Sequence, residues 1–93
     1  MTGKQRRYLR ALGHALKPVV QVGHDGVSDA LVQAAGAQLE AHELIKVKIL
    51  EPNDRRECAG LLAQKCAAEL AQVLGRTALL YRARKERPEI RLP

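Results

Sequence analysis

The chain has 93 residues, which is room for one hydrophobic core and therefore for a single domain over residues 1–93. Its 16 Lys and Arg against 10 Asp and Glu leave a formal net charge of +6 and a pI near 9.8, which favours an anionic partner. No apolar run approaches the roughly 18 residues of a membrane span, so the sequence predicts a soluble protein with no membrane partner.

The first predicted element is a basic amphipathic helix over residues 3–15. Thr2 and Gln5 fit a capping box, and Leu9, Leu12 and Leu16 then recur at helical spacing as the apolar face. Basic side chains fall together on the side of the helix opposite the leucines, as 3.6 residues per turn requires. This basic stripe consists of Arg6, Arg7, Arg10, His14 and Lys17. It is either a solvated helix face or part of a binding surface.

A strand over residues 18–22 and a second helix follow, joined by a glycine loop. Pro18 ends the first helix and opens a β-branched run, and Ser28 can cap the second helix. The tight Gly-x-x-Gly turn between them is Gly23, His24, Asp25 and Gly26. The residues that the second helix turns inward are Val27, Leu31, Ala35 and Leu39.

Residues 44–50 alternate and predict a second, half-buried strand. Ile45, Val47 and Ile49 lie on one face, while Lys46 and Lys48 lie on the other. The strand therefore carries two lysines on an outward face.

The last third of the chain predicts one long helix and two strands. Asp54 and Glu57 start the helix after a turn at Pro52, and Gly75 is placed to stop it. Its apolar positions are Cys58, Leu62, Cys66, Leu70 and Val73. A strand over residues 77–82, a basic turn and a short edge strand over residues 89–92 complete an αβαβαββ order. We expect a compact α/β (α+β) domain with a four-stranded mixed sheet and three helices.

The two cysteines indicate a reducing compartment. Cys58 and Cys66 are eight residues apart on the predicted helix, which separates them by about 12 Å, too far for a disulfide. With no signal peptide, this pattern predicts a cytoplasmic protein, and Cys66 is expected to be a small core residue.

Enzyme chemistry finds little support in the sequence. The three histidines are dispersed, and neither cysteine has metal-ligand spacing. The glycine loop lacks the Lys and Ser/Thr of a P-loop and the third glycine of a dinucleotide fingerprint. We therefore expect no catalytic residue, metal site, cofactor or small-molecule substrate. If the protein is an enzyme, the adjacent His42 and Glu43 are the best candidates for its catalytic residues.

The glycine loop is instead suited to gripping a nucleic-acid backbone. Two glycines let phosphates approach closely, and the following helix directs N–H groups at the same place. RNA-binding KH modules use a GXXG loop in this way. The basic first helix, Lys46, Lys48 and the basic turn that begins at Arg82 strengthen this interpretation. With only two tyrosines for stacking, contacts should favour phosphate and ribose, and hence structured RNA.

Three blocks in order give the chain a resemblance to a known family over essentially its whole length. They are residues 16–27 around the glycine loop, residues 42–49 and residues 75–82. The sequence resembles the CRM domain in its stand-alone bacterial form, the YhbY type of ribosome-associated protein. The resemblance implies a fold similar to the C-terminal domain of bacterial translation initiation factor three. It also implies RNA binding through the loop and association with ribosomal RNA in precursors of the large ribosomal subunit. Asp25 departs from the polar or basic residues often found there, and it is also placed to cap the next helix.

The sequence therefore predicts a monomeric, non-catalytic RNA-binding protein that assists ribosome maturation. A protein-binding adaptor in ribosome assembly, without direct RNA contact, remains the alternative. The predicted RNA-binding residues are Gly23, His24, Asp25, Gly26, Arg6, Arg7, Arg10, Lys17, Lys46, Lys48, Arg82, Arg84 and Lys85.

Overall fold

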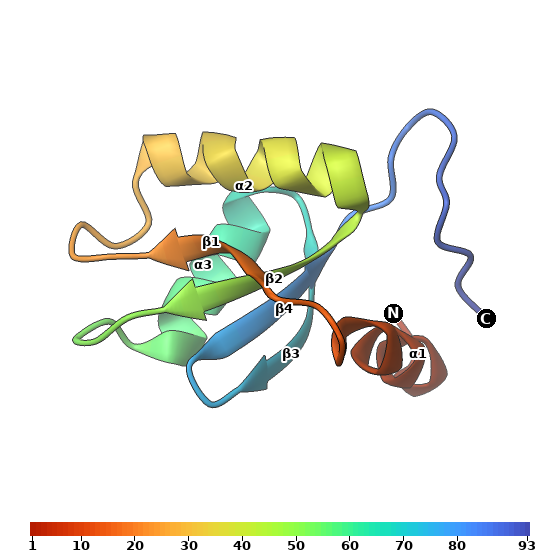
Figure 1. Ribbon diagram of the computed structural model, residues 1–93, viewed down its shortest axis with the longest axis horizontal. Coiled ribbons are helices and arrows are strands. Elements are labelled where there is room, and N and C mark those ends of the chain that lie inside the picture. The colour runs from red at the N-terminus through yellow and green to blue at the C-terminus, as the bar shows by residue number, and fades with distance from the viewer.

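A four-stranded mixed sheet organises the computed structural model, which describes residues 1–93 (Figure 1). The chain order is α1 (Gly3–Gly13), β1 (Pro18–Val22), α2 (Asp29–His42), β2 (Leu44–Ile49), α3 (Arg55–Lys65), β3 (Glu69–Leu74) and β4 (Thr77–Tyr81). The strands lie in the order β1-β2-β4-β3, with only the β1–β2 pair parallel. The structure confirms the predicted single α+β domain, and the αβαβαββ order matches, although β3 was not predicted and the predicted strand over residues 89–92 is absent.

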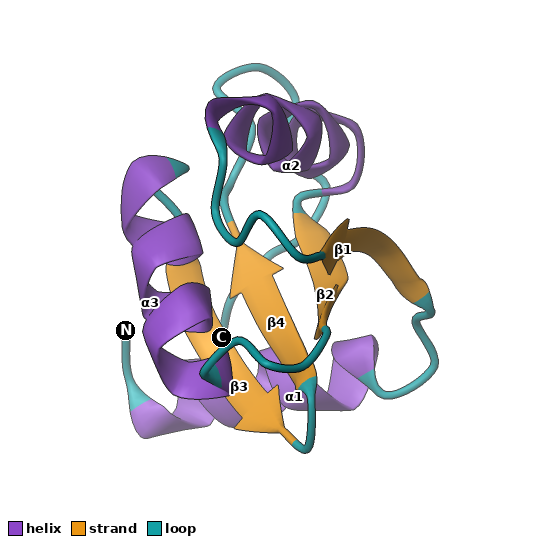
Figure 2. Cartoon of the chain, turned by 90° about the vertical axis from the view of Figure 1, so that its left-hand side faces the viewer, coloured by secondary structure: helices purple, strands orange, loops and turns teal.

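The helices lie on both sides of this sheet. Helices α2 and α3 cover one face, where β2 contributes Ile45, Val47 and Ile49 to a core cluster of 13 buried residues (Figure 2). Helix α1 packs on the opposite face, which we call the α1 face, and buries Leu9 in a second cluster of 5 residues with Leu44 and other sheet side chains. The predicted alternation of β2 is confirmed, because each of its faces meets a different helix layer.

Local capping explains where each helix begins. Thr2 and Gln5 form the predicted capping box of α1, and the Ser28 hydroxyl accepts the Leu31 N–H at 3.1 Å at the start of α2. Asp54 caps α3 in the same way.

Helix α1 ends at Gly13 rather than at residue 15, and of its predicted leucine face only Leu9 is buried. No helix in the structure is long and apolar enough to cross a membrane.

The predicted long third helix is wrong beyond Lys65. Ala67 adopts a left-handed φ of 52°, and its N–H donates to the Gln64 carbonyl while the Ala68 N–H donates to the Ala63 carbonyl at 2.8 Å. This is a Schellman end, which satisfies the last carbonyls of α3 and reverses the chain. Residues 69–74 then form β3, and Gly75, with φ 57°, lies in the two-residue turn to β4 rather than at a helix end.

The predicted edge strand over residues 89–92 is also absent. Residues 82–93 follow β4 as an irregular tail that turns back toward α1, where the Gln5 side chain donates to the Pro93 carbonyl at 3.2 Å. Ile90 and Leu92 pack against the cluster under α1. The sheet edges are β1 and β3, and each has a register irregularity, between Pro18 and Val20 and between Leu70 and Gln72.

Candidate nucleic-acid interface

The Gly-x-x-Gly loop lies at the carboxyl end of β1 and leads directly into α2. The Gly26 N–H donates to the Gly23 carbonyl at 3.0 Å, which closes the turn and leaves His24 and Asp25 exposed at its tip. Gly26 has a φ of 66°, a conformation that side-chain-bearing residues rarely adopt. An added Cβ on Gly23 would have no heavy atom within 4 Å, so its surroundings are open to a ligand.

Two neighbouring loops hold this turn in place. The Asn53 side-chain amide donates to the Gly23 carbonyl at 2.8 Å and to the Leu50 carbonyl at 3.0 Å. The Arg76 guanidinium donates to the Ile49 carbonyl at 2.6 Å and also to the Asn53 carbonyl. Residues 23–26, 50–54 and 75–76 therefore form one tied unit, which we call the loop end.

Asp25 does not cap α2, contrary to one expectation from the sequence. Ser28 is the N-cap, and the Asp25 side chain is exposed without a hydrogen bond to the protein. Asp29 adds a second carboxylate in the first turn of the helix. These charges oppose the attraction of the helix terminus for phosphate, so cations nearby must supply most of the attraction.

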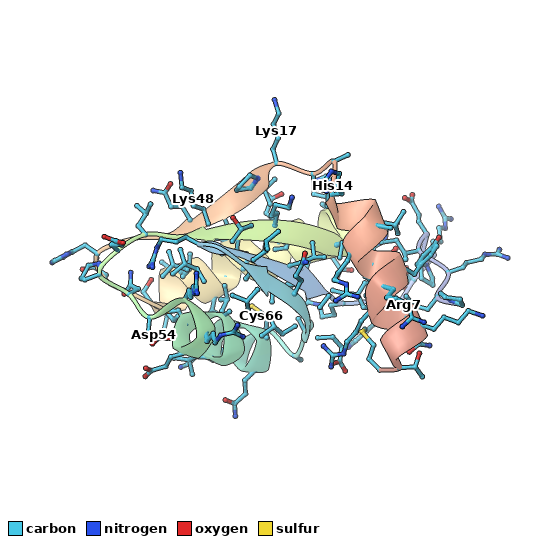
Figure 3. All side chains as sticks on the ribbon, turned by 90° about the horizontal axis from the view of Figure 1, so that it is seen from below. Arg7, His14, Lys17, Lys48, Asp54 and Cys66 are labelled. Carbon is cyan, nitrogen blue, oxygen red and sulfur yellow. The ribbon has the colours of Figure 1, made fainter.

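Two lysines on β2 and one that precedes β1 lie along the pair of strands next to the loop. Lys48 is paired with Gln21, two residues before Gly23, and Lys46 is paired with Pro18. Both lysines lie on the α1 face, Lys48 exposed and Lys46 half-buried. Lys17 precedes the strand and extends away from the domain (Figure 3). The structure thus places Lys46 and Lys48 on β2, next to the edge strand β1, and Lys17 just before β1 begins.

The basic stripe of α1 divides between surface and scaffold. Arg7 and Arg10 are exposed on the helix, and Arg7 and His14 are visible along it in Figure 3. Arg6 instead donates from Nη1 to the Leu70 carbonyl of β3 at 2.6 Å. Arg6 therefore fastens α1 to the sheet, although the sequence placed it with the binding residues.

The basic turn after β4 is mostly used inside the protein. Arg82 donates to the carbonyls of Cys66 at 2.7 Å and Gly36 at 3.1 Å, joining the end of α3 to the middle of α2. Arg84 donates to the Ala41 carbonyl at 3.1 Å near the end of α2. Of the three basic residues predicted here, only Lys85 is exposed. All three lie at the opposite end of the sheet from the glycine loop.

Glu43 anchors the tail at that opposite end. Its carboxylate accepts the backbone N–H groups of Arg84 at 2.8 Å, Glu89 at 2.7 Å and Ile90 at 3.0 Å, and the residue is 1% exposed. Burial alone would raise the pKa of this carboxyl, but the three N–H groups and the Arg84 charge outweigh it and hold the pKa below its ordinary value. Glu43, Leu44, Tyr81, Arg82 and residues 83–93 form what we call the tail end.

The two cysteine thiols of the chain both have raised pKa values. Burial raises the pKa of the Cys66 thiol and, with the nearby Glu57 and Asp54 charges, that of Cys58, so both thiols stay protonated at neutral pH. Both cysteines are unpaired, and Cys66 is a buried core residue as predicted. No three His, Cys, Asp or Glu side chains gather as metal ligands would.

Sequence reasoning missed the residues that shape the loop end. Asn53 and Arg76 were not singled out, because their partners lie 30 and 23 residues away in the chain. The one local signal was Asn53 beside Pro52, where a turn was expected and where Asn is a common turn residue.

Known proteins share both the sequence and this architecture. The CRS1 / YhbY (CRM) domain matches residues 1–82. "Probable RNA-binding protein YqeI" of Bacillus subtilis is 41% identical over 95 residues, covering 100% of this chain and 99% of the relative. "Probable RNA-binding protein PA4753" of Pseudomonas aeruginosa is 36% identical over 84 residues, covering 88% and 81%. The solution structure of the hypothetical protein SAV1595 from Staphylococcus aureus superposes with a TM-score of 0.87 at 42% identity, covering 100% and 99%. The chain belongs to the CRS1 / YhbY (CRM) domain family.

Proposed function

We propose that this chain is a non-catalytic, monomeric cytoplasmic protein that binds structured RNA through the glycine loop and the exposed cations beside it. The observation that carries the proposal is the placement of Lys17, Lys46 and Lys48 along the parallel strands β1 and β2, the first of which ends in the loop. Phosphates can contact the Gly23 backbone while these lysines neutralise their charge. Relatives that match most of the chain are named as RNA-binding proteins, which supports the same partner.

The interface we propose is smaller than the set of basic residues suggests. It contains the loop, the three lysines and the exposed arginines of α1, Arg7 and Arg10. Arg6, Arg82 and Arg84 are left out, because their guanidinium groups already donate to backbone carbonyls. Lys85 is left out because it lies at the tail end.

The RNA we propose is ribosomal RNA in precursors of the large ribosomal subunit, whose maturation the protein assists. The support is the resemblance of residues 16–27, 42–49 and 75–82 to the ribosome-associated bacterial form of the family. A catalytic role for His42 and Glu43 is disfavoured, because both Glu43 carboxylate oxygens accept backbone N–H groups and its pKa is lowered.

Binding measured against salt tests the RNA proposal. Several neutralised phosphates should release counterions together, so affinity for a structured ribosomal RNA fragment should fall steeply between low and physiological salt. Lys46→Glu with Lys48→Glu should weaken binding on the order of a hundredfold and flatten the salt slope by about two or more. Lys65→Glu with Arg91→Glu is the matched control, since both residues are exposed outside the interface. A salt-independent affinity would contradict the proposal.

Sequencing of RNA crosslinked to the protein in cells tests the choice of RNA. We expect large-subunit ribosomal RNA to be enriched with the parent protein and lost with the Lys46 and Lys48 double variant. Enrichment of another RNA class would refute the ribosomal assignment while leaving RNA binding intact. Efficient crosslinking to proteins, with no RNA above background, would instead favour the adaptor.

A further inference from the structure

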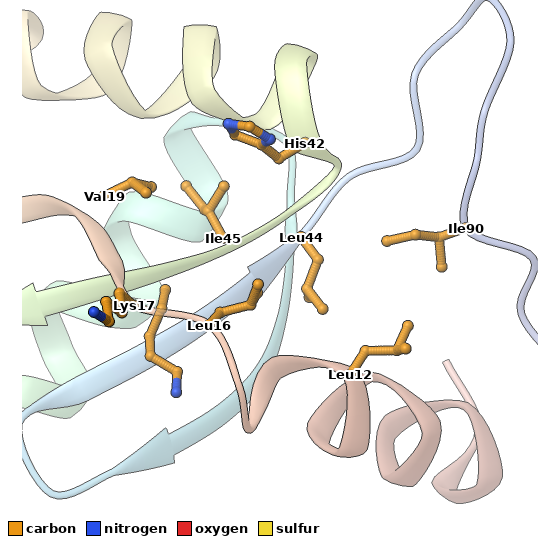
Figure 4. A pocket seen from close by; sticks show the side chains of 9 residues that line it. Leu12, Leu16, Lys17, Val19, His42, Leu44, Ile45 and Ile90 are labelled. Atoms are coloured by element: carbon orange, nitrogen blue, oxygen red, sulfur yellow. The ribbon is translucent and has the colours of Figure 1, made fainter.

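An apolar groove opens between α1, the start of β1 and the tail, away from the glycine loop. It has a volume of about 460 Å³ and nine lining residues, six of them hydrophobic. Figure 4 shows Leu12, Leu44 and Ile90 around its open space. This volume lies within the range of small-ligand sites.

The groove exists because β2 begins before its neighbour does. Strand β1 pairs from Pro18 opposite Lys46, so Leu44 and Ile45 extend past the edge strand. The connection between α1 and β1 crosses this gap and places Leu16 over it, 37% exposed. Leu12 is 40% exposed beside it, although the sequence predicted both leucines as part of the buried face of α1.

Backbone polar groups face this groove from β2. The Ile49 N–H donates at 2.8 Å to the carbonyl of Arg76, which directly precedes β4, so the odd-numbered residues of β2 direct their backbone groups to β4. The even-numbered residues therefore face β1, and the pairing with β1 begins only at Lys46. Leu44 thus turns its N–H and C=O toward a side on which no strand lies.

The charges around the groove are all of one sign. Lys17, Lys46 and His42 are its polar lining residues, and none of the nine lining residues is acidic. Lys17 and Lys46 belong both to this lining and to the surface that we assign to RNA, so the groove adjoins that surface. An apolar floor with backbone donor and acceptor, rimmed by cations, complements a nucleotide: a flat base joined to a phosphate.

We propose that this groove holds one unstacked nucleotide of the bound RNA. The base packs against Leu12 and Leu16 and meets the Leu44 backbone, while its phosphate lies against Lys17 and Lys46. This inference rests on the proposed RNA-binding function and adds to it a preference for RNA with an unpaired nucleotide. Such a site supplies the base contact that a surface poor in aromatic residues otherwise lacks.

The test uses two hairpin RNAs of equal length and charge, one with a bulged 2-aminopurine and one with that base paired. We expect the parent protein to bind the bulged hairpin on the order of tenfold more tightly. The 2-aminopurine emission should rise only for the bulged RNA, because the base leaves its stacked neighbours. Leu12→Asn with Leu16→Asn keeps the net charge and should abolish this preference while leaving affinity for the paired hairpin unchanged.

Leu61→Asn is the matched control, because Leu61 is a comparably exposed leucine, at 39%, on α3. It should keep the preference, and methyl NMR of the parent protein provides a second measurement in case the double variant is poorly folded. Leu16, Val19 and Ile90 methyl signals should shift with the bulged RNA and not with the paired one.

Equal binding of the two hairpins, or methyl shifts confined to other surfaces, would overturn the nucleotide site and leave the proposed function standing. In that case a protein segment would be the candidate occupant of the groove. Binding of neither hairpin at low salt would refute the RNA-binding function itself, and the groove proposal with it.

Discussion

The loop end and the tail end of the sheet use their basic residues differently. At the tail end, Arg82 and Arg84 bind carbonyl groups at the helix ends and a buried carboxylate holds the chain in place. At the loop end, Arg76 also binds carbonyl groups, but His24, and Lys48 on the adjoining strand β2, are exposed beside a backbone that is open to a ligand. Basic residues therefore indicate a binding surface only when those that already donate hydrogen bonds within the protein are left out of the set.

The comparison predicts that changes at the tail end alter stability and that changes at the loop end alter RNA affinity. Each variant below lies at one end, except Gly13→Ala in α1, so that melting and binding report on different regions. A tail-end variant that weakens RNA binding, or a loop-end variant that lowers stability, would contradict this division.

The largest effect is expected from Glu43→Ala at the tail end. Three backbone N–H groups lose their buried acceptor, which should lower the free energy of unfolding by about 3 kcal/mol or more. Urea denaturation measures this loss. At urea concentrations below the midpoint of unfolding, the variant should bind RNA with the affinity of the parent protein. If the variant is as stable as the parent, the Glu43 carboxylate does not anchor the tail.

The pH dependence of stability should identify Glu43 as an ionised acceptor. Its pKa in the folded protein lies below the ordinary value of 4.5, so its charge stabilises the fold above that pH. The contribution is lost as the pH falls from 4.5 through the folded pKa, because over this interval the unfolded state binds the proton more readily than the folded state does. Glu43→Gln should be less stable than the parent at neutral pH, with the difference shrinking in acid. Melting curves that keep a constant difference down to strong acid would contradict this assignment.

Two glycine-to-alanine changes form a matched pair across the molecule. A Cβ on Gly13 would lie 2.7 Å from Leu79 Cδ1, and Leu79 is only 2% exposed. Gly13→Ala should therefore cost about 1 kcal/mol or more of stability and leave RNA affinity unchanged. Gly23→Ala meets nothing within 4 Å, so it should melt like the parent but bind RNA about tenfold more weakly, because the Cβ occupies space needed by phosphate.

Thermal melting measures the stability of the two glycine variants, and filter binding measures their affinity for RNA. If Gly23→Ala binds RNA as well as the parent does, the glycine loop is a structural turn and the lysines carry the contact alone.

The smallest effects are expected from the tip of the loop. His24→Asp should weaken RNA binding severalfold by repulsion, and Asp25→Lys should strengthen it by a similar factor. Because Ser28 rather than Asp25 caps α2, neither change should alter the melting temperature. Fluorescence anisotropy at one fixed salt concentration can measure both affinities. If the two variants change the affinity for RNA in the same direction, the tip of the loop does not lie against a phosphate.

Sequence alone predicted the features that depend on neighbouring residues. The Thr2 and Ser28 caps and the alternation of β2 are set within a few positions, and all three are confirmed. The helix-like apolar spacing that continues past Lys65 was misleading, because α3 ends in a left-handed Ala67 rather than at a glycine. Without a glycine or proline to mark that end, β3 was assigned to the helix.

The candidate site was harder to predict because the role of an arginine depends on the fold. Arg82 binds a carbonyl 16 residues away and Arg6 one 64 residues away, and nothing in the local pattern separates them from exposed Arg7. The groove was missed for the same reason, since it depends on where β1 begins relative to β2.

The irregular register of both edge strands has a consequence for crowded assemblies. Strands β1 and β3 each depart from regular pairing once, which bends an edge that could otherwise accept a strand from another chain. This disfavours pairing of either edge with a strand from another copy of the chain, even at high local concentration. Repulsion between domains of net charge +6 acts in the same direction.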